Sequence, residues 1–212
     1  CDGRGDHTAA ADEIFRQGIM EQYQLSASGG SEFTRYYTSL SYRREEGVQL
    51  TNQFERFAVT INVDQKASEK LTFGNNLMIA STVNDRIKGD NFLDGVYSGA
   101  VKSLPYFYPY DEFGRIIGPG SPDYARFPNF NPVGQAVLPR FESTALKILG
   151  GIFADYQFTD DLKFRTKFSN DYNNEAEDQY DQSSTAIGGF LESVGGQGYG
   201  VYSTGTYATY VN

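Results

Sequence analysis

The sequence has few of the residues that build common active sites: one cysteine, one histidine and no tryptophan in 212 residues. A lone Cys1 excludes an internal disulfide. His7 has no second histidine and no nearby cysteine, which excludes the usual transition-metal sites and His-based catalytic triads. No glycine-rich phosphate loop joins a strand pattern to a helix pattern. The sequence therefore supports no enzyme and requires no metal or cofactor.

Long apolar runs and basic clusters are also missing. No run of 18 apolar residues is present, which excludes a transmembrane helix. The formal net charge is -9, which argues against a nucleic-acid partner, because binding to phosphates needs clustered Lys and Arg. Aromatic residues are abundant, with 16 Tyr and 16 Phe, although only 39% of the chain is hydrophobic. Such a composition fits either a soluble β-rich protein with a thin core or a sheet with one face toward lipid.

Two short features near the N-terminus have simple interpretations. Cys1 would suit a lipoprotein after signal cleavage, but a chain that simply begins there needs no further assumption, since no signal segment precedes it. Residues 4–6 form an Arg-Gly-Asp tripeptide, as in integrin ligands, and a chance match explains three residues better.

Proline is confined to one stretch of the chain, at positions 105, 109, 119, 122, 128, 132 and 139. Because proline cannot donate a hydrogen bond to a sheet, it is excluded from central strands. The proline-free flanks instead alternate apolar and polar residues, as in Phe57, Val59 and Ile61, which predicts half-exposed strands. The expected strands are 57–63, 71–79, 146–158 and 162–172, with weaker ones near 21–28, 35–43 and 198–211.

The expected connections alternate between short and long. Short ones are 29–33, 65–70 and 159–161, and long ones are 44–53, about 84–143 and about 174–197. Transmembrane barrels show this alternation, with short periplasmic turns and long extracellular loops, whereas a soluble sandwich has no reason to follow it. The motif Asp64, Ser68, Glu69, Leu71 and Phe73 returns as Asp155, Thr159, Asp160, Leu162 and Phe164. We interpret the echo as two similar hairpins at short turns.

The predicted fold class is therefore all-β: a segment of a large transmembrane antiparallel outer-membrane β-barrel. It has about six or seven strands, too few to close a barrel, whose smallest natural version has about eight. We expect residues 1–20 to lead into the barrel and residues 21–212 to form part of it. Residues 84–143 are expected to form one long extracellular loop rich in proline and aromatic residues.

A series of short motifs at matching spacing carries a family resemblance over residues 12–175. The motifs are Asp12-Glu13-Ile14-Phe15-Arg16, Ser28-Gly29-Gly30-Ser31-Glu32, Thr34-Arg35-Tyr36-Tyr37, Glu46-Gly47, Phe54, Arg56-Phe57, Asn62, Asp64, Leu71, Phe73-Gly74, Asn76-Leu77 and Tyr108-Pro109-Tyr110-Asp111-Glu112. This series resembles the SusC/RagA family of TonB-dependent outer-membrane transporters of Bacteroidetes. Residues 1–11 depart from the family, which usually carries a Trp just before the Asp-Glu-Ile-Phe stretch. The plug domain, the TonB box and the closing strand are not among these residues.

The resemblance implies a function and partners. It implies TonB-dependent import of an oligosaccharide or peptide across the outer membrane, by a multi-pass barrel of roughly 22 strands with a plug. The implied partners are a SusD-like surface lipoprotein, the TonB complex and outer-membrane lipid. Two alternatives stay open: a soluble or cell-surface β-sandwich that binds carbohydrate, and a passive porin. The sandwich would bury Phe57, Val59, Ile61, Leu71 and Phe73 under a second sheet, and the importer would expose them to lipid.

The candidate contact residues lie in the long loop: Tyr106, Phe107, Tyr108 and Tyr110. Aromatic side chains could stack on sugar rings or contact a surface lipoprotein, since they offer large rigid contact area at low entropy cost. The alternative is that they pack the loop against itself or join an interfacial aromatic girdle.

Two charged sets complete the candidates. The acidic residues Asp171, Glu175, Glu177, Asp178 and Asp181 lack the spacing of a calcium loop, and we expect a solvated loop there. Lys163, Arg165 and Lys167 alternate onto the expected lumen face. There they could attract anionic substrate, pair with plug carboxylates, or simply contribute to a polar lumen.

Overall fold

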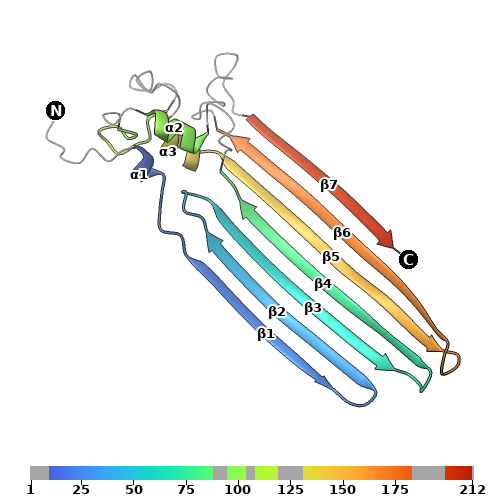
Figure 1. Ribbon diagram of the computed structural model, residues 1–212. Helices are drawn as coiled ribbons and strands as arrows, with labels where there is room; N and C mark the ends of the chain where they lie inside the picture. Colours follow the sequence, from blue (N-terminus) through green and yellow to red (C-terminus); the bar gives the residue numbers. More distant parts are fainter. Residues whose placement is uncertain (1–9, 88–94, 104–107, 119–130, 183–198, 212) are drawn as a thin grey trace.

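A computed structural model describes residues 10–87, 95–103, 108–118, 131–182 and 199–211. These residues form three short helices and seven strands (Figure 1). The elements in chain order are α1 (Ala10–Glu13), β1 (Met20–Gly30), β2 (Thr34–Glu46), β3 (Gln53–Lys66), β4 (Leu71–Asp85), α2 (Val96–Lys102), α3 (Pro132–Val137), β5 (Arg140–Gln157), β6 (Lys163–Asp181) and β7 (Tyr199–Val211).

The seven strands form one antiparallel sheet in the order β1-β2-β3-β4-β5-β6-β7, so that each strand pairs with the next one along the chain. Figure 1 shows this meander as a long ribbon of strands, with β1 and β7 at its two edges. Both edges present unpaired backbone groups, and a transmembrane sheet needs every such group paired. The sheet is open, as expected for part of a larger barrel.

The registers place the predicted apolar positions on a single face. Leu40 pairs with Val59, Val59 with Ile79, and Ile79 with Ile148, in one row across four strands. We call this the apolar face. Its side chains are open to the surroundings: 46% of Phe57, 46% of Phe73 and 61% of Ile152 is exposed. All strands of the described residues belong to this one sheet, so the arrangement favours the lipid-facing interpretation over the sandwich.

The alternation of short and long connections is confirmed. The strands are joined by residues 31–33, 67–70 and 158–162 at one end of the sheet. Residues 47–52, 86–139 and 182–198 make the connections at the other end, where the helices also lie (Figure 1).

The short turns share one mechanism. The hydroxyl of Ser68 accepts hydrogen bonds from the backbone N–H groups of Lys70 and Leu71, and the hydroxyl of Thr159 accepts from Leu162. Ser68 and Thr159 hold equivalent positions in the repeated motif, so the predicted similarity of the two hairpins is confirmed. Ser31 does the same for Phe33 and Thr34 in the first turn. Such side-chain bonds satisfy turn N–H groups that the sheet leaves unpaired.

The predicted loops were too long at several strand ends. Residues 44–46, 84–85, 140–143 and 174–181 were expected in loops and instead belong to β2, β4, β5 and β6. Their polar side chains have neighbours of opposite charge. Arg44 of β2 pairs with Glu55 of β3, and Glu177 of β6 pairs with Arg86, which follows β4. Charge pairing across strands therefore continues the sheet beyond the apolar alternation.

The helices form a small unit that the sequence did not predict. Ile14, Val96, Ala100, Val133 and Ala136 are buried together, and Leu50, Ile87, Tyr110 and Ile116 pack against them. We call α1, α2, α3 and residues 108–117 the helical cap. No described helix is long and apolar enough to cross a membrane.

Candidate functional site

The apolar face is bounded along the strands. On β4 its apolar residues run from Leu71 to Val83, which at ~3.3 Å per residue is about 40 Å of strand. At a tilt of ~45°, such a length spans roughly 28 Å, close to the hydrocarbon thickness of a bilayer. The apolar face has the height that a membrane-spanning wall needs.

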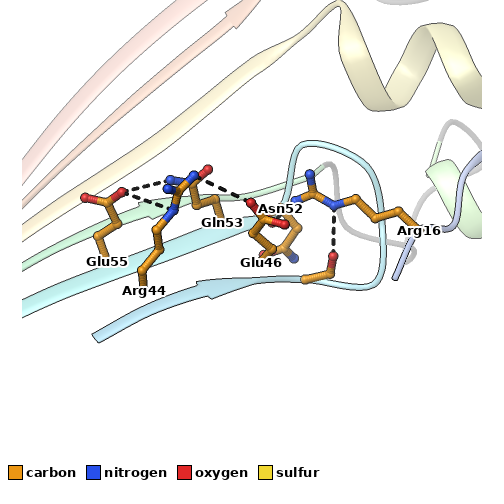
Figure 2. Close-up of polar contacts among 7 residues, drawn as sticks. Arg16, Arg44, Glu46, Asn52, Gln53 and Glu55 are labelled. Carbon is orange, nitrogen blue, oxygen red and sulfur yellow. Dashed lines mark hydrogen bonds and ion pairs between the residues drawn. The ribbon is translucent and has the colours of Figure 1, made fainter. Parts of the chain in front are cut away.

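Charged residues replace the apolar ones toward the cap end of the same face. Arg44, Glu46 and Glu55 meet there, with Arg44 3.5 Å from Glu46 and 3.8 Å from Glu55 (Figure 2). Beyond them, Asp85 pairs in register with Glu142, and Glu142 with Asp178. Desolvating these charges in hydrocarbon would be costly. The apolar face therefore ends here: Val83, which pairs with Glu55, is its last apolar residue on β4, and Asp85 follows on the same face.

The opposite face is polar and carries the predicted cations. Asp155 binds the Arg165 guanidinium through two 2.6 Å contacts, and the Lys163 ammonium lies 2.9 Å away. The Arg165 guanidinium also lies 5.9 Å from the centre of the Phe153 ring. Two of the three cations are thus partnered within the wall itself. Lys167 lies on the same face, in register with Phe153.

The acidic residues of β6 do not form a solvated loop, so this expectation was wrong. They lie on the strand and meet basic or polar neighbours: Lys147 lies 3.6 Å from Asp171, Ser143 bonds Glu175, and Arg86 pairs with Glu177. Asp178 pairs with Arg140, and Asp181 is fully buried. Among the described residues no group of three or more potential metal ligands is found.

A glycine on the polar face allows two neighbours to approach the sheet closely. A Cβ atom at Gly74 would lie 2.5 Å from Asp64 Oδ1, 2.7 Å from the Phe153 ring and 2.7 Å from the Val63 carbonyl oxygen. The Phe153 side chain therefore covers the space that a side chain at position 74 would need. This contact joins β3, β4 and β5 on the polar face.

The predicted aromatic contact residues fall into two groups. Tyr106 and Phe107 lie outside the described residues. Tyr108 is 49% exposed and forms an edge-to-face pair with Tyr110, with ring centroids 5.8 Å apart. Tyr110 instead packs against the buried cluster of the cap, and burial, followed by the Glu13 carboxylate, raises the pKa of its phenol. Ligand contact by these residues stays a prediction, and Tyr110 has a packing role in addition.

Sequence reasoning missed the turn that carries this pair. Asp111 accepts hydrogen bonds from the backbone N–H groups of Phe113 and Arg115 and from the Arg115 side chain, and Gly114 has a positive φ of 76°. These bonds, the backbone N–H of Arg115 foremost, lower the pKa of Asp111. The ionised Asp111 carboxylate therefore stabilises the turn fully at a pH above the ordinary aspartate pKa. The stabilisation is lost as the pH falls through the lowered pKa of Asp111.

Asn131 fastens the turn to α3. Asn131 is buried, with 3% of the residue exposed. Its side-chain amide donates to the carbonyl oxygens of Pro109 and Ile117 at 2.8 Å each. Its oxygen accepts from the backbone N–H of Val133 and so caps the helix. A polar residue before a proline is a possible signal for such a helix start.

We expect Asn131→Ala to loosen the cap while leaving the sheet intact. The change removes a helix cap and leaves two buried carbonyl oxygens without their donor, which together cost on the order of 2–3 kcal/mol. Limited proteolysis should then cut residues 108–117 faster. Asn174→Ala is the control, because its amide bonds one hydroxyl, that of Thr206, on the sheet surface. Equal cleavage in both variants would contradict the capping role of Asn131.

Comparison with known proteins gives the same class as the geometry. An open antiparallel sheet with one exposed apolar face, short turns at one end and long connections at the other is a segment of a transmembrane-type β-barrel.

No protein-family model matches the chain. It is 27% identical over 209 residues to TonB-dependent receptor P3 of Formosa agariphila, covering 95% of the chain and 19% of that protein. It is 24% identical over 177 residues to TonB-dependent receptor SusC of Bacteroides thetaiotaomicron, covering 76% of the chain and 18% of that protein.

Solved structures show the same fold. The RagAB peptide importer in its open-open state matches with a TM-score of 0.68 at 22% identity, over 82% of this chain and 19% of that chain. Its closed-closed state matches with a TM-score of 0.66. The chain thus spans about a fifth of the length of these relatives. In sequence and in fold the chain is similar to a barrel segment of SusC/RagA-like TonB-dependent transporters.

Proposed function

We propose that this chain forms part of the barrel wall of a TonB-dependent importer that carries nutrients across the bacterial outer membrane. The observation that carries the proposal is the exposed apolar face, which has the height of a bilayer core and ends at a charged row on the cap side. The polar face then lines the lumen, and Asp155, Arg165 and Lys163 belong to that lining. The names of the relatives agree with such a role.

The direction of the wall follows from its connections. In transmembrane barrels the short turns are periplasmic and the long loops extracellular. We therefore place residues 31–33, 67–70 and 158–162 in the periplasm and the helical cap outside the cell. The predicted division into a lead-in (1–20), a partial barrel (21–212) and a long extracellular loop (84–143) is kept as part of this proposal, with the loop shortened to residues 86–139 between β4 and β5.

The proposed partners follow from the relatives. SusC and the RagAB importer support a SusD-like surface lipoprotein on the extracellular side and the TonB complex on the periplasmic side. The proposed substrate is an oligosaccharide or a peptide, the latter because RagAB is named a peptide importer. Tyr106, Phe107, Tyr108 and Tyr110 remain the proposed contacts for substrate or lipoprotein. The relatives are named as receptors and importers, and we propose that this chain has no enzymatic activity of its own.

The proposal predicts that nutrient uptake depends on both the gene and TonB. Deleting the gene in its native host should abolish growth on the oligosaccharides or peptides that induce it, and uptake of labelled substrate should fall to background. Removing TonB should have the same effect, because import is energised through it. A complementing gene restores uptake if the proposal holds. Uptake that persists without TonB would point instead to a passive porin.

A further inference from the structure

The segment before β1 runs beside the connection between β2 and β3. The backbone N–H of Leu50 donates to the carbonyl of Ile14 at 3.0 Å, and that of Arg16 donates to Val48 at 2.7 Å. The N–H of Glu46 donates to Ile19 at 2.8 Å. Residues 14–19, which we call the latch, therefore run antiparallel beside this connection, and Phe15 and Gln49 form an isolated β-bridge between the two segments.

The Arg16 side chain closes the contact. Its Nε donates to the carbonyl of Gly47 at 3.1 Å, and its Nη2 donates to the carbonyl of Asn52 at 2.9 Å (Figure 2). Gly47 itself donates its N–H to the same Asn52 carbonyl at 2.9 Å. One guanidinium thus ties both ends of residues 47–52 to the latch, and hydrogen bonds from a charged donor are the stronger kind.

Glycine is required where the latch passes closest. A Cβ atom at Gly18 would lie 2.2 Å from the carbonyl oxygen of Glu46 and 3.3 Å from the carbonyl carbon of Gly47. Both clashes are with backbone, which cannot move aside as a flexible side chain could. The latch and the end of β2 are therefore in direct backbone contact.

The other side of the latch belongs to the helical cap. Ile14 is fully buried in the cluster formed with Val96 and Val133. The β2–β3 connection reaches the cap a second time through Thr51, whose backbone has a positive φ of 65° and whose hydroxyl donates to the carbonyl of Ala136 at 2.6 Å. The latch thus contacts the β2–β3 connection through Arg16, the end of β2 through Gly18, and the cap through Ile14.

We propose that the latch, held by the Arg16 guanidinium, fixes the helical cap to the strand ends, so that cap and barrel wall move as one body. The helices α2 and α3, which lie between β4 and β5 in the chain, are then held at a fixed position relative to the strand ends. Loss of Arg16 releases the cap and leaves the sheet in place. The proposal concerns the coupling of cap and wall, and it holds whether or not the wall serves an importer.

Hydrogen exchange on the full-length protein in detergent micelles tests this coupling. In Arg16→Ala, the amides of Ser103, Gln135 and Leu138, bonded within the cap, should exchange about tenfold faster or more, since hydrogen bonds from a charged group are lost. Amides of β4 and β5 should keep their wild-type rates. Arg16→Lys keeps the charge, but a lysine ammonium lacks the planar guanidinium that binds the carbonyls of Gly47 and Asn52 together. Exchange in the cap should therefore be faster than in the wild type but slower than in Arg16→Ala.

Arg43→Ala is the matched control, because Arg43 lies near the same end of β2 and its ion pair among the described residues is with Glu45, two positions along the same strand. It should leave exchange in the cap unchanged. Wild-type cap rates in both Arg16 variants would overturn the latch. Equal acceleration in the cap and in β4–β5 would also overturn it, because Arg16 would then support the whole sheet. If Arg16→Ala fails to fold, Arg16→Lys tests the latch by itself, through the same comparison of exchange rates in the cap and in β4 and β5. None of these outcomes depends on nutrient uptake.

Discussion

Replacing Ile61 by Arg should sharply reduce the amount of folded protein in the outer membrane. Ile61 lies near the middle of the apolar face, in register with Leu77, and an arginine at the bilayer midplane costs about 2–4 kcal/mol. The expected loss corresponds to a factor of roughly thirty or more in the folding equilibrium. Heat-modifiable migration of the outer-membrane fraction measures it, since folded barrels and unfolded chains migrate differently.

Thr60→Arg is the control for this change. Thr60 is the adjacent residue of β3 and points to the polar face, where a long cation can extend into a water-filled lumen. It should leave the folded fraction near the wild-type level. Equal losses for Ile61→Arg and Thr60→Arg would show that the two faces do not differ in environment, and the apolar face would then not be a lipid-facing one.

The second large effect is expected at Gly74. Valine there would place atoms against the Val63 carbonyl and the Phe153 ring, both already within 2.7 Å of the Cβ position. Strands β3, β4 and β5 would have to separate locally, and overpacking of this kind costs about 3 kcal/mol. Urea or guanidinium unfolding of the refolded protein in micelles should show a lower midpoint with an unchanged slope.

Gly205→Ala offers the matched control. A Cβ atom at Gly205 would meet no heavy atom within 4 Å, and the residue lies on the same polar face of the sheet. Its unfolding midpoint should stay at or above the wild-type value. If Gly74→Val were as stable as Gly205→Ala, the close approach of Phe153 to the strand would not matter for stability.

Much of the wall could be predicted from the sequence because barrel strands encode their orientation locally. In residues 57–63 and 71–79, large apolar side chains recur at every second position with few exceptions, and such a period fixes both the strand and the face. The placement of all prolines between 105 and 139 marked the long connection equally well. The turn residues Ser68 and Thr159 repeated at matching positions because both close a hairpin of the same kind.

The strand ends and the cap were harder to predict, for physical reasons. Residues 174–181 are mostly charged or amide-bearing, and their strand forms because β5 and Arg86 offer partners that lie far away in the sequence. The helices α2 and α3 are only one or two turns long and are stabilised by burial around Ile14 rather than by their own propensity.

The candidate site was only partly predictable. An aromatic cluster at 106–110 was visible in the sequence, but not the fact that Tyr110 packs inward while Tyr108 stays exposed. That difference depends on Asn131, which lies far along the chain and fixes the turn through two carbonyl groups. Likewise, nothing near Arg16 in the sequence indicates that its guanidinium binds the carbonyls of residues 47 and 52, because backbone acceptors leave no signature in side-chain chemistry.

The central claim is that odd-numbered residues of β3 face lipid and even-numbered ones face water. The most direct test is a cysteine scan of positions 57–63 with Cys1 replaced by serine, each site carrying a nitroxide label in a lipid bilayer. We expect positions 57, 59, 61 and 63 to be relaxed mainly by oxygen, which concentrates in hydrocarbon, and positions 58, 60 and 62 mainly by a water-soluble nickel complex. Uniform accessibility along the strand, or the opposite alternation, would contradict a membrane-spanning wall.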